Sequence, residues 1–108
     1  MKESKKELLP VFENVKSYYK KAEVKKYYNK NNIIVKYELL SYNTIVLTYK
    51  ESKIKLNKNI KKELLTSQTT LRHIKEFIKQ YYYLLDEETK KTLEKNNFSK
   101  KTLLQLFY

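Results

Sequence analysis

Cysteine, glycine and tryptophan are all missing from this sequence of 108 residues, which contains a single proline. Without cysteine there is no disulfide bond, no thiolate nucleophile and no cysteine-ligated zinc site. Gly-rich phosphate loops, nucleophile elbows and dinucleotide fingerprints are excluded as well, because they need a positive φ or a close backbone approach. Asparagine, which tolerates the left-handed backbone region best after glycine, has to serve the turns. We therefore expect breaks at Asn29, Asn31, Asn32, Asn57, Asn59, Asn96 and Asn97.

Long apolar runs are also missing. No stretch approaches the roughly 20 residues that a helix needs to cross a bilayer. The charged residues 1–7 are not followed by the apolar stretch of a secretory signal. The sequence therefore predicts an intracellular protein without a membrane segment.

Acidic residues are scarce relative to basic ones. The chain has 24 lysine and arginine residues against 12 aspartate and glutamate residues, a net charge of +12. Such an excess gives a positive surface potential and favours phosphate-rich or acidic partners. An AT-rich genome is a competing explanation for the many lysines. Because an AT-rich genome usually raises the glutamate content together with the lysine content, it explains the excess of basic over acidic residues only in part.

The spacing of apolar residues predicts an α+β fold. Residues 3–15 show helical spacing, and Pro10 makes this N-terminal helix short or broken. Residues 22–56 contain β-branched and aromatic runs that predict a small antiparallel sheet of three to four strands. In the third of these runs, alternation places Ile45, Leu47 and Tyr49 on one side of the strand.

Helices are predicted for the rest of the chain. The best one covers residues 67–85, where a stripe with a period of 3.6 residues contains Leu71, Ile74, Ile78, Tyr81 or Tyr82, and Leu85. Asp86 opens a second helix, and Ser99 caps a short last one. These helices pack against the sheet in a single domain over residues 1–108.

Catalysis has little support among the residue types present. Asp86, Glu87 and Glu88 cluster, but the helix dipole favours acids in a first turn. His73 is the only histidine, so no catalytic triad can be identified, and neither a metal nor a cofactor is implied. A nuclease that uses His73 with lysine and tyrosine side chains is the enzymatic alternative.

The predicted main helix contains both the only arginine and the only histidine of the chain. Ser67 or Thr69 supplies its N-cap, and Arg72 and Glu76 are expected to pair on its outer face. His73 lies beside the apolar stripe, where a histidine is more often a hydrogen-bonded structural residue than a ligand. We expect Arg72 and His73 to anchor the helix against the sheet or a hairpin.

Lysine and tyrosine alternate over residues 16–36, where seven lysines accompany one acid, Glu23. Lysines attract phosphates, and exposed tyrosine rings stack on unpaired bases or fill a protein pocket. The equal alternative is a solvated lysine face with half of the rings in the core. A second basic run contains Lys53, Lys55, Lys58, Lys61 and Lys62. The candidate partner-binding residues are Lys16, Tyr19, Lys20, Lys21, Lys25, Lys26, Tyr28, Lys30, Lys36, Lys53 and Lys55.

Three blocks of sequence carry a resemblance. They are Lys-Ser-Tyr-Tyr-Lys-Lys-Ala-Glu-Val at 16–24, Leu-Ser-Tyr-Asn-Thr-Ile-Val at 40–46 and Ser-Gln-Thr-Thr-Leu-Arg-His-Ile-Lys-Glu-Phe-Ile-Lys-Gln at 67–80. Together they resemble a family of small, largely uncharacterised proteins from phages and mobile elements of low-GC bacteria. The resemblance implies a Ser-Tyr-Asn-Thr hairpin and a Thr-Thr-x-Arg-His-Ile helix, whose motif residues here are Tyr42, Asn43, Thr70, Arg72 and His73. Tyr19 and Lys20 stand where that family has Tyr-Gly, and residues 81–108 form a C-terminal helical extension outside the family-like core at 16–80.

The resemblance implies an origin in phage or mobile DNA, and it brings no activity with it. Small phage proteins of this description often block a host defence complex. We therefore expect an anti-CRISPR protein, which occupies the nucleic-acid path or guide RNA of a CRISPR-Cas ribonucleoprotein through its basic, tyrosine-rich surface. It would act as a monomer or homodimer in the cytoplasm of the bacterial host cell. The alternative is a general DNA- or RNA-binding accessory protein without catalysis.

Overall fold

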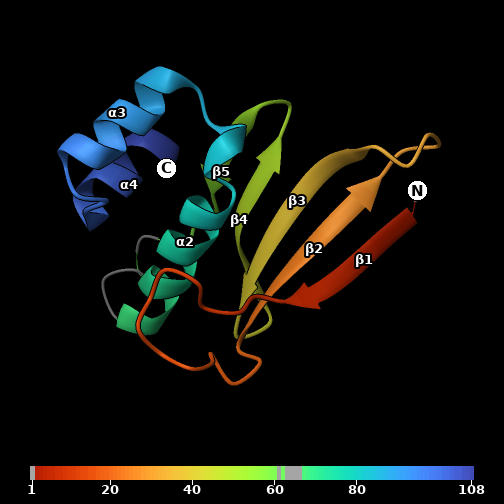
Figure 1. Ribbon diagram of the computed structural model, residues 1–108, viewed down its shortest axis with the longest axis horizontal. Coiled ribbons are helices and arrows are strands. Elements are labelled where there is room, and N and C mark those ends of the chain that lie inside the picture. Colours follow the sequence, from red (N-terminus) through yellow and green to blue (C-terminus); the bar gives the residue numbers. More distant parts are fainter. Residues whose placement is uncertain (1, 61, 63–66) are drawn as a thin grey trace.

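In the computed structural model the described residues are 2–60, 62 and 67–108 (Figure 1). Over these residues the chain forms five strands, β1 (Lys2–Glu7), β2 (Ala22–Tyr28), β3 (Ile34–Ser41), β4 (Thr44–Lys50) and β5 (Lys53–Leu56). They are followed by the helices α2 (Gln68–Gln80), α3 (Glu87–Lys95) and α4 (Lys100–Phe107), with the short 3-10 helix η1 (Tyr82–Leu84) after α2. The α+β class predicted from the sequence is confirmed.

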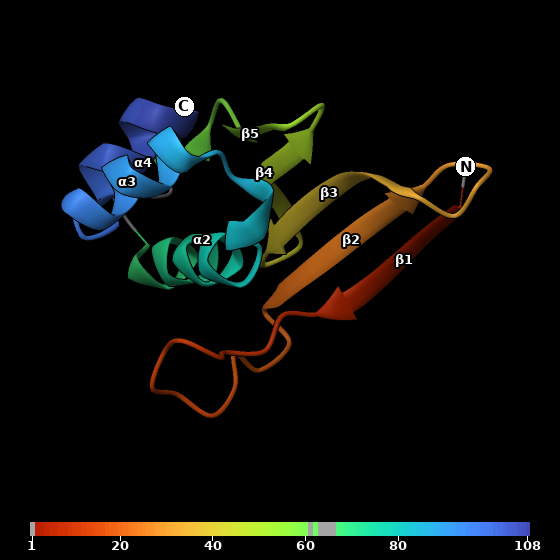
Figure 2. The same ribbon diagram turned by 45° about the horizontal axis from the view of Figure 1, so that its top comes forward.

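The strands form one antiparallel sheet in the order β1-β2-β3-β4-β5, so each strand pairs with its neighbour in the sequence. The α2 helix lies along one face of the sheet, and α3 and α4 pack together near β5 (Figures 1 and 2). None of the helices in the described ranges is long and apolar enough to cross a membrane. The sheet is larger than the predicted three to four strands because the N-terminal segment joins it.

This N-terminal segment is an edge strand, and the prediction of a short helix there is wrong. Lys2–Glu7 pairs with β2, and Glu3 and Lys5 make ion pairs across the strands with Lys25 (3.4 Å) and Glu23 (3.7 Å). The segment has no apolar alternation, so its composition does not indicate a strand. Backbone pairing with β2 determines its structure, and charged side chains suit an exposed edge.

The helical stripe that the sequence predicts breaks at Pro10, which has no N–H to donate. Leu8 is buried against the sheet, whereas Leu9 and Phe12 lie in solvent. Residues 8–21 form an irregular connection that lies beside α2 (Figure 2) and contacts its side chains. We call this segment the strap.

The β4 strand departs from simple alternation. The pairing of β3 with β4 changes register so that Val46 has no partner in the ladder. Val46 and Leu47 are both fully buried, while Ile45 is exposed. Such a β-bulge turns two successive side chains toward the core. The predicted inward position of Ile45 is therefore wrong, and that of Leu47 is correct.

The two hairpins that flank β4 use positive φ angles without glycine. The turns are Tyr42-Asn43, with φ of 52° and 67°, and Glu51-Ser52, with φ of 53° and 64°. Two-residue hairpins favour this geometry because its twist matches that of the strands. Asn32 also adopts a positive φ, as expected for an asparagine in a turn. Tyr42, Glu51 and Ser52 thus adopt the left-handed backbone conformation, which is strained for residues other than glycine and asparagine.

The α2 helix begins where the sequence predicts and ends earlier. Ser67 Oγ accepts a backbone N–H three residues on at 3.1 Å, which is an N-cap bond. The helix ends at Gln80 although the apolar stripe continues to Leu85. Leu85 and Asp86 are extended, which places the Asp86 carboxylate to cap α3. The part of the predicted helix beyond Gln80 instead forms the 3-10 helix η1 and the extended lead into α3.

The C-terminal helices share the core with the sheet. Leu93 of α3 and Leu103 of α4 are fully buried in the same cluster as Leu56 of β5. Ser99 caps α4 by accepting a backbone N–H at 3.2 Å, as the sequence predicts. The sheet face opposite α2 is not covered by any of the described helices (Figures 1 and 2), and that face carries the candidate site.

Candidate functional site

The two faces of the sheet differ in chemistry. Side chains alternate along a strand, and residues paired across strands share a face. The face toward α2 holds the buried residues Val24, Leu39 and Leu47. We call the opposite side the open face. It carries Glu3, Lys5, Glu7, Glu23, Lys25, Tyr27, Lys36, Glu38, Leu40, Ile45, Thr48, Lys50, Lys53 and Lys55.

The β1–β3 half of the open face neutralises its own charges. Lys36 Nζ lies 3.4 Å from Glu38 Oε2, and the Tyr27 hydroxyl donates to Glu38 Oε1 at 2.6 Å. The ammonium groups of Lys25 and Lys36 lie 5.5 Å and 5.0 Å from the centroid of the Tyr27 ring. The hydrogen bond to Glu38 raises the pKa of Tyr27, and the contact with the Tyr27 hydroxyl raises the pKa of Lys25. An anionic ligand has little free positive charge to meet on this half.

The β4–β5 half carries lysines that face one another. Lys36, Lys50 and Lys53 occupy one row straight across β3, β4 and β5, and Lys55 lies opposite Thr48 in the next row. Within the described part of the chain, Lys50, Lys53 and Lys55 form no ion pair. The row spans about 10 Å because adjacent strands lie roughly 4.8 Å apart. Like charges placed directly opposite destabilise a sheet. We call Lys36, Lys50, Lys53 and Lys55 the lysine face.

A hollow of about 540 Å³ opens beside the lysine face. It is lined by Thr48, Lys55, Leu56, Asn57, Lys58 and Asn59. The Tyr108 hydroxyl donates to the backbone carbonyl of Lys58, which ties this turn to the end of α4. Glu51, in the hairpin turn between β4 and β5, is an exposed acid. The lysine face and this hollow together present several ammonium groups that can neutralise phosphates.

The structure separates the predicted partner-binding residues into groups. Lys25, Lys36, Lys53 and Lys55 share the open face. The strap holds a second group, Lys16, Tyr19, Lys20 and Lys21, while Lys26 and Tyr28 lie on the face toward α2 and Lys30 lies in the β2–β3 connection. Strand alternation sends neighbours to opposite faces, so the segment 16–36 does not form one surface. Lys61 of the second basic run lies outside the described residues.

Lys50 belongs to the site although the sequence does not single it out. A two-residue turn pairs Lys50 with Lys53, and this pairing puts both on one face. That signal is local and could be read from the sequence. The position of Lys36 beside Lys50 depends on the register of β3 and β4, which the bulge at Val46 shifts. No local pattern reveals this second pairing.

The strap is held against α2 by the buried carboxylate of Glu76. Its two oxygens accept the backbone N–H groups of Val11, Phe12 and Glu13 at 3.1 to 3.2 Å. Gln80 Nε2 donates to the same carboxylate at 2.8 Å and to the Leu9 carbonyl at 2.7 Å. Successive N–H groups that turn toward one anion form a concave anion-binding nest. The strap therefore has a defined conformation without regular secondary structure.

Arg72 and Glu76 do not pair, so the predicted ion pair on the outer face of the helix is wrong. Glu76 is only 2% exposed and faces the strap, and Arg72 Nε lies 3.3 Å from Glu13 Oε1 instead. A buried carboxylate needs several hydrogen bonds, which the strap backbone supplies and one exposed guanidinium would not. The Tyr18 hydroxyl donates to Glu13 Oε2 at 2.6 Å, and burial together with this acid raises the pKa of Tyr18.

His73 is fully buried and joins α2 to the end of β3. Its Nδ1 lies 2.8 Å from Ser41 Oγ, which also contacts Thr70 Oγ1 at 3.1 Å. The Tyr18 ring packs edge-on against the imidazole at 4.7 Å between centroids. Burial lowers the pKa of His73 to about 4, so the ring is neutral at pH 7. Among the described side chains, no group of three His, Asp or Glu residues is placed to hold a metal ion.

A protein family matches most of the chain. Residues 6–100 match the model of the family described as "Family of unknown function (DUF8033)". The matched region runs from β1 to the first residue of α4 and includes both the lysine face and the strap. No curated protein and no solved structure matches the chain. The match across the sheet and the helices shows that this chain belongs to the DUF8033 family.

Proposed function

We propose that this protein is a non-catalytic binding protein whose lysine face holds the phosphate backbone of a nucleic acid. The observation that carries the proposal is the directly opposed pair of Lys50 and Lys53, which form no ion pair within the described residues and lie next to Lys36 on a sheet face that none of the described helices covers. Placing like charges side by side costs folding free energy, and a bound polyanion offsets that cost. The net charge of +12 adds long-range attraction for the same partner.

The chemistry of the face favours contacts to phosphates over contacts to bases. Lysine ammonium groups are point charges and lack the planar fork with which arginine reads a base edge. Tyr27, the aromatic residue of the open face, is engaged by Glu38 and two lysines. Phosphate contacts fix position without reading sequence. We therefore expect binding with little sequence preference.

The burial of His73 argues against the nuclease alternative. A general base has to come within hydrogen-bond reach of the proton that it removes. The imidazole is 0% exposed, and the partner of its Nδ1 is Ser41 of the same chain. A substrate would have to displace β3 or the strap to reach it.

The identity of the nucleic-acid partner as a CRISPR-Cas ribonucleoprotein in a bacterial cytoplasm stays a prediction from the sequence resemblance. That prediction requires tight binding to the assembled effector and poor binding to free RNA or DNA. A general accessory protein binds free nucleic acid well. Affinity for guide RNA alone and for the assembled effector, measured side by side, separates the two.

The proposal is tested by removing lysines in matched pairs. The double variant Lys50→Gln/Lys53→Gln removes two charges from the lysine face, and Lys91→Gln/Lys101→Gln removes two exposed charges from α3 and α4. Binding to a labelled oligonucleotide of about 20 nucleotides, single-stranded and duplex, is followed by fluorescence anisotropy from roughly 50 to 200 mM salt. Loss of lysine-face contacts should reduce the slope of log Kd against log salt by about 2 and weaken binding about tenfold or more.

The control pair is expected to change Kd by no more than about twofold, because distant exposed charges act mainly through the screened overall field. An equal loss in both double variants would mean that net charge alone drives binding. Failure of the unmodified protein to bind either oligonucleotide at the lowest salt would contradict the proposal outright. Circular dichroism of each variant verifies that the fold is retained.

A further inference from the structure

The strap exposes apolar side chains on a preformed loop. Five of them are largely in solvent, namely Leu9 (52%), Val11 (68%), Phe12 (58%), Val15 (43%) and Tyr19 (79%). Glu76 and Gln80 hold the backbone that carries these side chains, so the loop does not have to be ordered when a partner arrives. Apolar side chains that gather in one exposed segment mark an interaction site more often than scattered ones.

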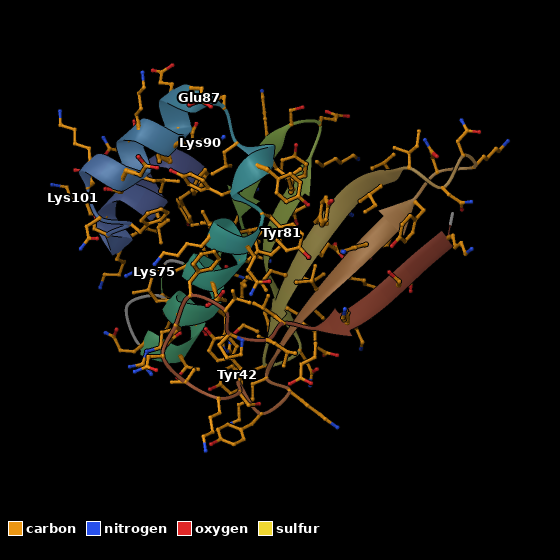
Figure 3. The ribbon with its side chains drawn as sticks, viewed as in Figure 1. Tyr42, Lys75, Tyr81, Glu87, Lys90 and Lys101 are labelled. Carbon is orange, nitrogen blue, oxygen red and sulfur yellow. The ribbon has the colours of Figure 1, made fainter. Side chains whose placement is uncertain are left out.

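A basic cleft lies between the strap and α2. Its volume is about 290 Å³, and its charged lining consists of three basic residues, Arg72, Lys75 and Lys79, and two acids, Glu13 and Glu76. Arg72 pairs with Glu13 and the strap backbone holds Glu76, so Lys75 and Lys79 are left to meet an anion. Lys75 lines this cleft from α2, and Lys101 belongs to α4 (Figure 3). Within the described residues Lys75 makes no ion pair. Burial and the neighbouring Lys79 lower the pKa of Lys75, and Glu13 offsets this lowering only in part.

These two features together indicate the chemistry of the occupant. Three of the five exposed strap side chains, Leu9, Val11 and Val15, offer nucleic-acid bases no ring on which to stack. A second copy of this chain would bring a further net charge of +12 toward the same basic cleft, which like-charge repulsion opposes. A protein segment that combines apolar side chains with aspartate or glutamate matches both the exposed strap and the cleft.

We propose that the strap docks an acidic, apolar segment of a partner protein. A carboxylate of that segment pairs with Lys75 in the cleft, and its apolar side chains pack on Val11 and Phe12. The strap lies on the side of the sheet that α2 covers, opposite the open face. Both surfaces can therefore be occupied at once, and this second site does not depend on the function proposed for the lysine face.

The test uses a defined probe. It is a fluorescein-labelled helical peptide of about 15 residues, with leucine on one face and glutamate on the other. One control peptide replaces glutamate by lysine, and another replaces leucine by serine. Anisotropy at about 150 mM salt, where distant charges are screened, should show affinity for the first peptide at least about tenfold above that for either control.

Matched variants of the protein locate the binding. Phe12→Ser is compared with Ile33→Ser, because both side chains are 58% exposed and Ile33 lies in the distant β2–β3 connection. Lys75→Gln is compared with Lys101→Gln on α4. We expect Phe12→Ser and Lys75→Gln each to weaken peptide binding at least about fivefold, and the two controls to change it by less than about twofold.

Three results would overturn the proposal. The first is absence of binding, or equal binding of the lysine peptide. The second is an equal loss of affinity in Ile33→Ser and Lys101→Gln. The third is a concentration-dependent dimer in sedimentation experiments that Phe12→Ser abolishes, because it would assign the strap to a second copy of the chain.

Discussion

The carboxylate of Glu76 holds the strap in place, and Glu76→Gln is the variant that tests this role. The substitution keeps the size of the side chain but replaces one oxygen by an amino group. The carboxylate accepts hydrogen bonds from three backbone N–H groups, from Gln80 Nε2 and, at 3.5 Å, from the Tyr18 hydroxyl. The new amino group therefore faces backbone N–H donors to which it makes no bond. The oxygen that becomes an amino group loses its charge-assisted hydrogen bonds. The hydrogen bonds to the remaining oxygen become bonds between neutral groups.

The magnitude follows from these contacts. A hydrogen bond to a charged group contributes about 1.5 to 3 kcal/mol, and a buried donor left without a partner costs about 1 to 3 kcal/mol. The strap can open toward water, which limits the total loss to about 3 kcal/mol. For a domain of this size, that loss lowers Tm by about 15 °C. The matched control is Glu51→Gln, which removes the same charge from an exposed turn and should change stability by less than about 0.5 kcal/mol.

Two measurements check the result. Urea and thermal unfolding followed by circular dichroism give the change in free energy, and hydrogen exchange gives the protection of the backbone amides of Val11, Phe12 and Glu13. We expect these three amides to lose protection in Glu76→Gln and to keep it in Glu51→Gln. A loss of stability below about 1 kcal/mol with all three amides still protected would refute the assigned role of Glu76.

Two further predictions concern buried and strained positions. The pKa of His73 is about 4 in the folded protein and 6.5 in the unfolded chain. As the pH falls, the unfolded chain therefore binds the proton first. The free energy of unfolding should drop by about 3 kcal/mol between pH 6.5 and pH 4. His73→Gln should flatten that part of the curve of unfolding free energy against pH, and an unchanged slope would show that other groups cause it. Ser52 has a φ of 64°, so Ser52→Gly should stabilise the protein by about 1 kcal/mol in urea unfolding. A destabilised Ser52→Gly would mean that glycine's greater freedom in the unfolded chain outweighs the relief of strain at this turn.

Local signals predict the part of the fold that local interactions determine. β-Branched runs separated by short turns identify β2 to β5, and caps at Ser67, Asp86 and Ser99 identify the starts of α2, α3 and α4. These features depend on residues within a few positions of each other. The β1 strand has no such signal, because it exists through pairing with β2, fifteen or more residues away in the sequence.

The same distinction between local and long-range interactions explains which parts of the candidate site can be predicted from the sequence. Alternation is enough to place Lys53 and Lys55 on one face of β5. The row that joins Lys36 to Lys50 and Lys53 depends on a register that the bulge at Val46 sets, and bulges leave no clear mark in the sequence. Glu76 shows the limit most clearly. Helical spacing predicts that Glu76 pairs with Arg72. In the folded protein Glu76 instead accepts hydrogen bonds from strap residues more than sixty positions away in the sequence.

The most direct test of the lysine face is a nuclear magnetic resonance titration with a short oligonucleotide, which reports on each lysine separately. The signals of the side-chain CεH₂ groups are assigned through single Lys→Gln variants and followed as ligand is added. We predict that Lys50, Lys53 and Lys55 shift first and most, and that the lysines of α3 and α4 shift little. Shifts of equal size for lysines all over the surface, or shifts confined to the helices, would contradict the claim that the open face of the sheet is the binding site.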